Sequence, residues 1–175
     1  DHIKDGRGHL VLLGGEPGIG KSRLVRVLEE RIAADRSTRW ECRCSPYHQD
    51  SALYPFLDLF ERVLQFDRDE APAERFAKLE AYLARCDLAA PEALALWAGL
   101  LSLPLPDTVP TLDLTPQRQK ENTFEVIVAL LLGLAAKQPL LLIVEDLHWA
   151  DPSTLELADA LFEQVAASPI LVLMT

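Results

Sequence analysis

The chain has 175 residues, a formal net charge of −10 and three cysteines. This length is enough for one domain with a substantial hydrophobic core. The acidic balance argues against a surface that coats DNA or RNA, because phosphate backbones select lysine and arginine. The odd, small number of cysteines argues against a disulfide framework. We therefore expect a protein of the reducing cytoplasm that does not bind nucleic acid directly.

Neither a signal peptide nor a membrane span is evident in the sequence. The longest apolar stretch near a predicted helix, residues 126–136, is about half the length that a bilayer requires. The sequence lacks an initiator methionine and stops inside the apolar run 170–174. We expect an excerpt of a longer protein, whose other domains are partners of this one and which does not use it to contact membranes.

The first predicted elements are a strand and a helix joined by a glycine-rich loop. Residues 1–8 form a polar lead-in, and residues 9–13 are a short apolar run typical of a buried parallel strand. Residues 22–32 show helical spacing, with one apolar face made by Leu24, Val25, Leu28 and Ile32. Between them, residues 15–22 match the whole phosphate-binding loop pattern Gly-x-x-x-x-Gly-Lys-Ser/Thr.

This loop predicts a ligand class from its chemistry. Its glycines allow backbone conformations in which successive N–H groups turn inward around phosphate oxygens. Lys21 supplies a compact positive charge for the β- and γ-phosphates, and the Ser22 hydroxyl is a candidate ligand of Mg²⁺. The helix that follows favours the same anion through its free N–H groups and its dipole. The predicted nucleotide-binding residues are Gly15, Glu16, Pro17, Gly18, Ile19, Gly20, Lys21, Ser22 and Arg23.

The middle of the chain is predicted to be mostly helical. Residues 37–44 alternate with period two and predict a second strand, followed by a loop over 45–50. Helices are predicted from about Pro55, from about Ala73, and over 91–101, and we interpret 52–101 as a helical insert that packs on the rest. Four prolines over 102–116 predict an extended loop, before a long helix over about 117–137.

The last elements complete a layered α/β domain. A strong strand over 140–144 precedes a helix that opens either with Asp151 as N-cap and Pro152 in its first turn, or with Ser153 as N-cap and Glu156 three residues later. A final strand covers 170–174. The alternation of strands and helices predicts a single domain over 1–175 with a mainly parallel sheet, in three layers, with the insert between its second and third strands.

Two carboxylates follow the strand 140–144 directly. Mg²⁺ prefers oxygen ligands and keeps several waters, so one carboxylate beside a bound phosphate is sufficient to hold it. A second carboxylate can polarise the attacking water. Glu145 and Asp146 are therefore the predicted metal ligands together with Ser22, and with Lys21 they are the predicted catalytic residues.

The loop at 15–24 and the run Val144-Glu-Asp-Leu-His-Trp-Ala-Asp-Pro-Ser-Thr-Leu155 resemble the P-loop ATPase modules of the AAA-like and STAND group, found in bacterial multidomain regulators. Residues 41–51, 102–106 and 115–121 look most like the subgroup associated with class III adenylate cyclases, which is related to the ATPase domains of LuxR-type regulators. The resemblance covers nearly the whole chain.

The resemblance implies ATP and Mg²⁺ as ligands, and a sheet in which the strand 170–174 lies between the loop strand and the carboxylate strand. It also implies that a fifth strand and a lid lie beyond residue 175. Thr175 itself is expected to occupy a sensor position near the γ-phosphate. Lys21 matches the phosphate lysine, Ser22 the Mg²⁺ hydroxyl, and Glu145 with Asp146 the acidic pair. One position departs from the pattern, since the metal residue is usually aspartate and here is Glu145. Either Glu145 holds the metal through water or Asp146 holds it directly.

Other residues admit plainer interpretations. Cys42, Cys44 and His48 suggest a metal site, but a fourth ligand is missing, so packing is the favoured reading. Trp149 is interpreted as a packing residue. His148 is either an exposed loop residue or a contact to phosphate or water.

The sequence thus predicts an ATP-binding, ATP-hydrolysing switch domain of a signalling or transcription-regulatory protein, with nucleotide-dependent self-association as a further expectation. The alternative is a nucleotide-gated interaction module with negligible hydrolysis, which the substitution at Glu145 motivates. A small-molecule kinase would need an acceptor site and lid arginines, and the sequence supports neither.

Overall fold

The structure is a computed structural model that describes residues 8–32 and 37–175, so the polar lead-in expected over 1–8 lies, except for Gly8, outside the described residues. The described residues form two compact units. The sheet unit runs up to Phe56 and resumes over Leu134–Thr175, and the helical unit covers Leu57–Gly133. The single domain expected over 1–175 stays a prediction.

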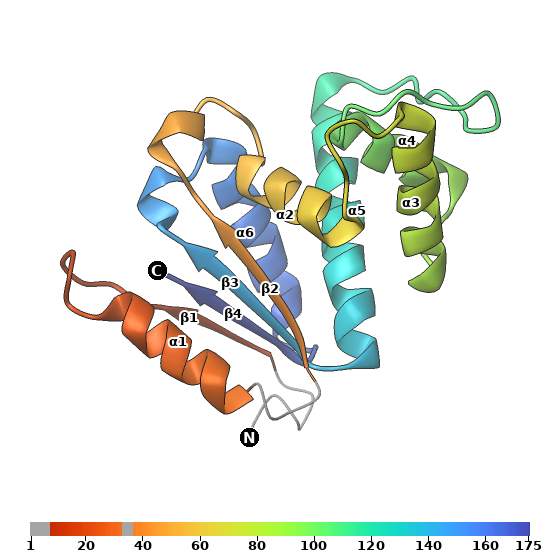
Figure 1. Ribbon diagram of the computed structural model, residues 1–175. Helices are drawn as coiled ribbons and strands as arrows, with labels where there is room; N and C mark the ends of the chain where they lie inside the picture. Colours follow the sequence, from red (N-terminus) through yellow and green to blue (C-terminus); the bar gives the residue numbers. More distant parts are fainter. Residues whose placement is uncertain (1–7, 33–36) are drawn as a thin grey trace. The chain divides into compact units, whose positions relative to one another are not determined.

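The sheet unit contains a parallel sheet in the order β1-β4-β3-β2. The strands are β1 (His9–Leu12), β2 (Thr38–Arg43), β3 (Leu140–Glu145) and β4 (Ile170–Met174). All four lie where the sequence predicted them, and β4 lies between β1 and β3 as the resemblance implied (Figure 1). Because the strands are parallel, their carboxyl ends meet at one edge of the sheet.

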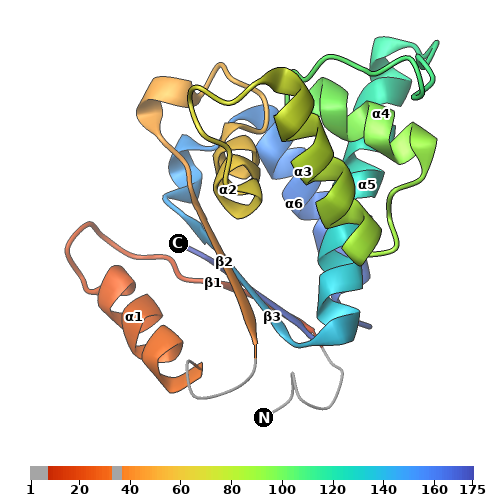
Figure 2. The ribbon, with the colours of Figure 1, turned by 45° about the vertical axis from the view of Figure 1, so that its right-hand side comes forward.

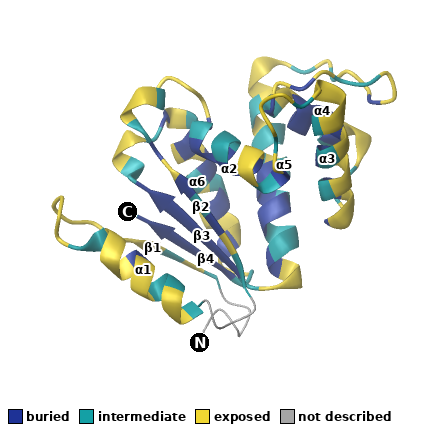
Figure 3. Ribbon diagram, viewed as in Figure 1, coloured by how far each residue is buried: buried dark blue, intermediate teal, exposed yellow. Residues whose placement is uncertain are grey.

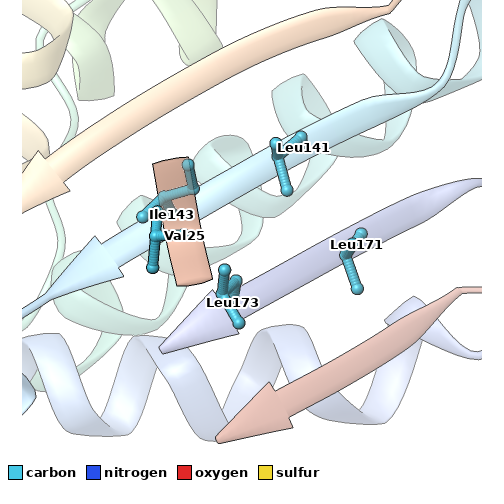
Figure 4. Close-up of a cluster of buried hydrophobic side chains, with 5 residues drawn as sticks. All are labelled: Val25, Leu141, Ile143, Leu171 and Leu173. Atoms are coloured by element: carbon cyan, nitrogen blue, oxygen red, sulfur yellow. The ribbon is translucent and has the colours of Figure 1, made fainter. Parts of the chain in front are cut away.

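Helices cover both faces of this sheet, which confirms the predicted α/β class (Figures 1 and 2). On one face, α1 (Lys21–Ile32) inserts Val25 into a buried cluster formed with alternate residues of the two central strands: Leu141, Ile143, Leu171 and Leu173 (Figure 4). The opposite face is covered by α6 (Pro152–Val165). Every residue of β3 and β4 is buried, as expected of parallel strands covered on both faces (Figure 3).

Four helices carry the chain through the helical unit and back: α2 (Tyr54–Leu64), α3 (Pro72–Arg85), α4 (Pro91–Leu100) and α5 (Pro116–Lys137). The first residues of α2 and the last residues of α5 belong to the sheet unit. The helical unit has its own core, in which the rings of Phe60 and Trp97 meet edge to face with centroids 4.5 Å apart. The predicted helices are present, and the proline-rich stretch before α5 has neither helix nor strand.

Two short 3₁₀ helices at the carboxyl edge of the sheet were not predicted. One, Pro46–His48, follows β2 and begins at Ser45, whose hydroxyl accepts a hydrogen bond from the Tyr47 N–H. The other, Leu147–Trp149, follows β3. The next helix, α6, begins with Asp151 as its N-cap, so the first of the two predicted helix starts is correct and the start at Ser153 is wrong. In the described residues, each helix is too short or too polar to cross a bilayer.

Candidate functional site

The glycine loop lies between the end of β1 and the first turn of α1. Gly18 and Gly20 have φ angles of 83° and 103°, which side chains would oppose, so glycine is needed at both positions. The Lys21 ammonium folds back over the loop and donates hydrogen bonds to the carbonyl oxygens of Gly15 (2.8 Å) and Glu16 (3.2 Å). The positive charge of Lys21 is therefore held at the mouth of the loop.

A cleft of about 920 Å³ opens above this loop at the carboxyl edge of the sheet. Its walls come from four parts of the chain: the end of β1 with the loop and the first turn of α1, the segment after β3, the first turn of α6, and the end of β4. The lining residues are Leu12, Leu13, Gly14, Gly15, Pro17, Gly18, Gly20, Lys21, Ser22, Arg23, Asp146, Leu147, His148, Leu155 and Thr175. Mixed apolar walls with a few convergent polar groups are typical of a small-molecule site.

Most of the predicted site residues meet in this cleft. Eight of them line it: Gly15, Pro17, Gly18, Gly20, Lys21, Ser22, Arg23 and Asp146. Three do not line it: Glu16, Ile19 and Glu145. The Ile19 side chain projects into solvent with 70% of the residue exposed. The chemical roles assigned to these residues remain predictions.

The two predicted acids have different surroundings. Glu145 is the last residue of β3 and is only 7% exposed. Its carboxylate accepts a 2.6 Å hydrogen bond from the guanidinium of Arg43, the residue in register with it at the end of β2. The Arg43 Nε atom also lies 3.4 Å from Asp146 Oδ2. Arg43 thus contacts both acids, although only Asp146 lines the cleft.

Asp146 stands at a sharp turn out of the sheet. Its backbone is left-handed (φ 57°, ψ 43°), a conformation that aspartate tolerates better than most residues. The turn is held by the end of β4, because the Asp146 N–H donates to the Thr175 hydroxyl (3.3 Å) and the Leu147 N–H donates to the Thr175 carbonyl (2.8 Å). The segment after β3 and the residue at the predicted sensor position therefore share hydrogen bonds.

Asp151 is a buried carboxylate that joins two segments of the sheet unit, with 2% of the residue exposed. Its Oδ1 atom accepts the N–H groups of Ser153 and Thr154 in the first turn of α6, and also the N–H of Leu53, before α2. Its Oδ2 atom accepts the Thr154 hydroxyl. Asp151 fixes the segment that follows β2 against the segment that follows β3.

Sequence reasoning missed Arg43 and the bond from Asp151 to Leu53. A signal for Arg43 was present, because it ends a predicted strand at the same edge where Glu145 ends another. The sequence contains no signal for the hydrogen bond between Asp151 and the Leu53 N–H, since 98 residues separate the two.

The proposed alternative of a cysteine and histidine metal site gains no support. His48 stacks on the Tyr54 ring with centroids 3.6 Å apart, and Cys42 and Cys44 are buried free thiols. Within residues 8–32 and 37–175, no three histidine, cysteine or acidic side chains are grouped to hold a metal ion. Burial, with smaller effects of the Asp151 and Asp146 carboxylates, raises the pKa of Cys44 to about 11, so this thiol stays protonated at neutral pH.

Comparison with protein families decides the relationship. A family model described as "AAA ATPase domain" matches residues 1–173. The chain belongs to this AAA ATPase domain family. A protein of Rhizobium meliloti (strain 1021), described as uncharacterized, is 29% identical over 176 residues. The match covers the whole of this chain and 17% of that relative. This AAA ATPase domain therefore spans about a sixth of the longer protein's length.

The residues present fit the ligands that the family uses, ATP with Mg²⁺. The cleft brings together a glycine loop with a lysine, a serine hydroxyl and one carboxylate. A cage made wholly of protein ligands is missing from the described residues, and Mg²⁺ does not need one, because it takes one or two side chains together with phosphate oxygens and water. The site therefore suits magnesium carried on a nucleotide.

Proposed function

We propose that this AAA ATPase domain binds ATP in the cleft above the glycine loop, hydrolyses it, and acts as a switch within a longer regulatory protein. One observation carries the proposal: Lys21 and Ser22 of the glycine loop line one cleft with Asp146, which is far from them in the sequence. The length of the Rhizobium relative supports a setting among other domains. The finer assignment to the STAND group and to cyclase-associated regulators rests on the sequence resemblance.

The polar groups of the glycine loop, Ser22 and Asp146 each have a chemical task under this proposal. The loop N–H groups and the Lys21 ammonium bind the β- and γ-phosphates, and Lys21 leaves the carbonyl oxygens of Gly15 and Glu16 to do so. The Ser22 hydroxyl and the Asp146 carboxylate hold the metal. Magnesium, when bound, supplies charge that stabilises the phosphoryl group in transfer. Together these groups orient the triphosphate for in-line attack by water.

The switch would act through the segment after β3. Thr175 holds the backbone of Asp146 and Leu147, and all three residues line the cleft. A γ-phosphate that engages the Thr175 hydroxyl directly, or Asp146 through the magnesium ion, would stabilise one arrangement of this segment, and its loss would release it. Because Asp151 ties the same segment to Leu53, the change would also reach the chain after β2.

One observation favours the second candidate function, a nucleotide-gated module with negligible hydrolysis. The Glu145 carboxylate is paired with Arg43 and lies outside the cleft lining, so it is poorly placed to polarise an attacking water. Binding would then be retained while turnover is slow. Release of inorganic phosphate by the purified chain separates the two candidates.

The first test is calorimetric titration with ATP, with and without Mg²⁺. Lys21→Ala should weaken ATP binding about 10- to 100-fold, because a charge-assisted bond to phosphate contributes roughly 1.5–3 kcal/mol. Arg26→Ala is a matched control, since Arg26 is an exposed cation of α1 that does not line the cleft. Unchanged affinity in a folded Lys21→Ala variant would contradict the site assignment.

A further inference from the structure

The ion pair at the ends of β2 and β3 bears on which acid serves the metal. Arg43 and Glu145 are in register on neighbouring parallel strands, so their side chains leave the same face of the sheet. The Cys44 N–H donates to the Glu145 carbonyl (2.9 Å), which continues the ladder to the last residue of each strand. The backbone therefore fixes both partners of the 2.6 Å contact.

Burial makes this pair difficult to separate. The Glu145 side chain is 10% exposed, whereas that of Arg43 is 65% exposed and that of Asp146 is 45% exposed. A carboxylate so far removed from water needs a compensating charge, and breaking such a pair from one side is costly. The Asp146 carboxylate, by contrast, is accessible to solvent and lines the cleft.

We propose that the ion pair with Arg43 keeps the Glu145 carboxylate from binding the magnesium ion of the nucleotide, so that Asp146 is the acid that binds the metal. The inference rests on the proposed ATPase function and assigns the acids within it. Arg43 is then a positioning residue: its Nη2 atom holds Glu145, and its Nε atom, 3.4 Å from Asp146 Oδ2, restrains the second acid at the cleft.

Charge arithmetic gives the expected size of the effect. Removing the guanidinium would leave the acids with one more unbalanced negative charge and would release Glu145 toward the cleft. Both changes favour a divalent cation and disfavour a bare triphosphate. At a separation of about 8 Å, and with the dielectric constant of water that suits an exposed guanidinium, the interaction of one charge with a divalent cation amounts to about a fivefold change in affinity.

The measurement is the gain in nucleotide affinity that magnesium provides. The non-hydrolysable analogue AMP-PNP is titrated into the whole chain in EDTA and in Mg²⁺, and the ratio of the two dissociation constants is compared between variants. Arg43→Met should raise this ratio about fivefold. Asp146→Asn should reduce it strongly, because it removes the acid assigned to the metal.

The double variant Arg43→Met/Glu145→Gln is decisive because it removes both charges and preserves the net charge. If Glu145 is withheld, the ratio stays within about twofold of that of the unmodified chain. A ratio as low as that of Asp146→Asn would mean that Glu145 is a metal ligand, and would overturn the proposal. Arg39→Met/Glu29→Gln is the matched control. Arg39 lies on the same strand as Arg43, and its guanidinium is 2.7 Å from the Glu29 carboxylate. Neither residue lines the cleft.

Circular dichroism checks that each variant is folded. If the double variant does not fold, Glu145→Gln is compared with Asp146→Asn, since each removes one negative charge: a smaller fall in the ratio for Glu145→Gln supports the proposal, and an equal or larger fall overturns it. Failure of the proposed function has a different signature. In that case either the unmodified chain would not bind AMP-PNP, or Lys21→Ala would bind it with the same affinity. Both results are independent of the substitutions at Arg43, Glu145 and Asp146.

Discussion

Asp151 shows how one carboxylate can determine local order at the edge of the sheet. Replacing it with alanine removes the N-cap of α6 and leaves the buried N–H of Leu53 without its acceptor. We expect a loss of about 2–4 kcal/mol in the free energy of unfolding, from the cap and the unsatisfied donor together. Asp151→Asn should lose less, because its amide oxygen can still accept these N–H groups.

Urea denaturation measures this loss. Asp159→Ala is the control, since Asp159 is exposed on the same helix and should change stability by less than about 0.5 kcal/mol. An equal effect of the two alanine substitutions would show that Asp151 has no special structural role.

Cys44 offers a second prediction at the scale of one residue. Burial and two nearby carboxylates raise its pKa to about 11, so the folded chain binds this proton more tightly than the unfolded chain does. The resulting stabilisation is present below the unfolded pKa of about 8.5 and is lost as pH rises toward 11.

Alkylation reads this out directly. In a Cys42→Ala/Cys86→Ala background at pH 8, iodoacetamide should modify Cys44 at least about a hundredfold more slowly in the folded chain than in denaturant, because the thiolate is scarce. Rapid modification under native conditions would contradict the assigned environment.

At the scale of elements, the join between the start of β1 and the end of α6 is tightly packed. A Cβ atom added at Gly8 would lie 2.0 Å from the Val165 carbonyl oxygen and 2.6 Å from that of Ser168. The backbone would have to move, so Gly8→Ala should destabilise the chain by about 1–3 kcal/mol. Gly14→Ala is the matched control, because its Cβ would meet no atom within 4 Å. Thermal unfolding followed by circular dichroism compares the two, and equal midpoints would refute the packing argument.

The elements themselves were largely predictable, because each depends on local pattern. The apolar runs of β3 and β4, the glycine loop and the proline at the start of α4 are all visible within about ten residues of sequence. The 3₁₀ helices after β2 and β3 were not predicted, since three-residue turns leave little periodicity.

The site was predictable only in part, for a related reason. Lys21 and Asp146 were found because each follows a strand in a recognisable pattern, and parallel strands bring their ends together. The partner of Glu145 depends on which strand lies beside β3 and on its register, and 102 residues separate Arg43 from Glu145. Only the sheet order and register show that Glu145 faces an arginine.

At the scale of the whole molecule, the chain passes between its two units inside helices. The boundary at residues 56 and 57 lies in α2, and the boundary at 133 and 134 lies in α5. Because helix formation is cooperative along the chain, melting of one unit should disturb the helices that continue into the other. We therefore expect one unfolding transition rather than two.

Nucleotide binding makes this expectation testable. A ligand that binds only the folded chain stabilises it by about 2.7 kcal/mol at one hundred times its dissociation constant. Trp40 reports on the sheet unit and Trp97 on the helical unit, so labelling with 5-fluorotryptophan allows ¹⁹F resonances to follow both units during heating. If unfolding is cooperative, Mg²⁺ and ATP should raise both midpoints equally, although the cleft belongs to the sheet unit. Lys21→Ala should reduce both shifts, because an affinity about 10- to 100-fold weaker leaves only about 1.4 to 0.4 kcal/mol of this stabilisation. A rise for Trp40 alone would mean that the units unfold separately, and that nucleotide binding stabilises only the unit that contains the cleft.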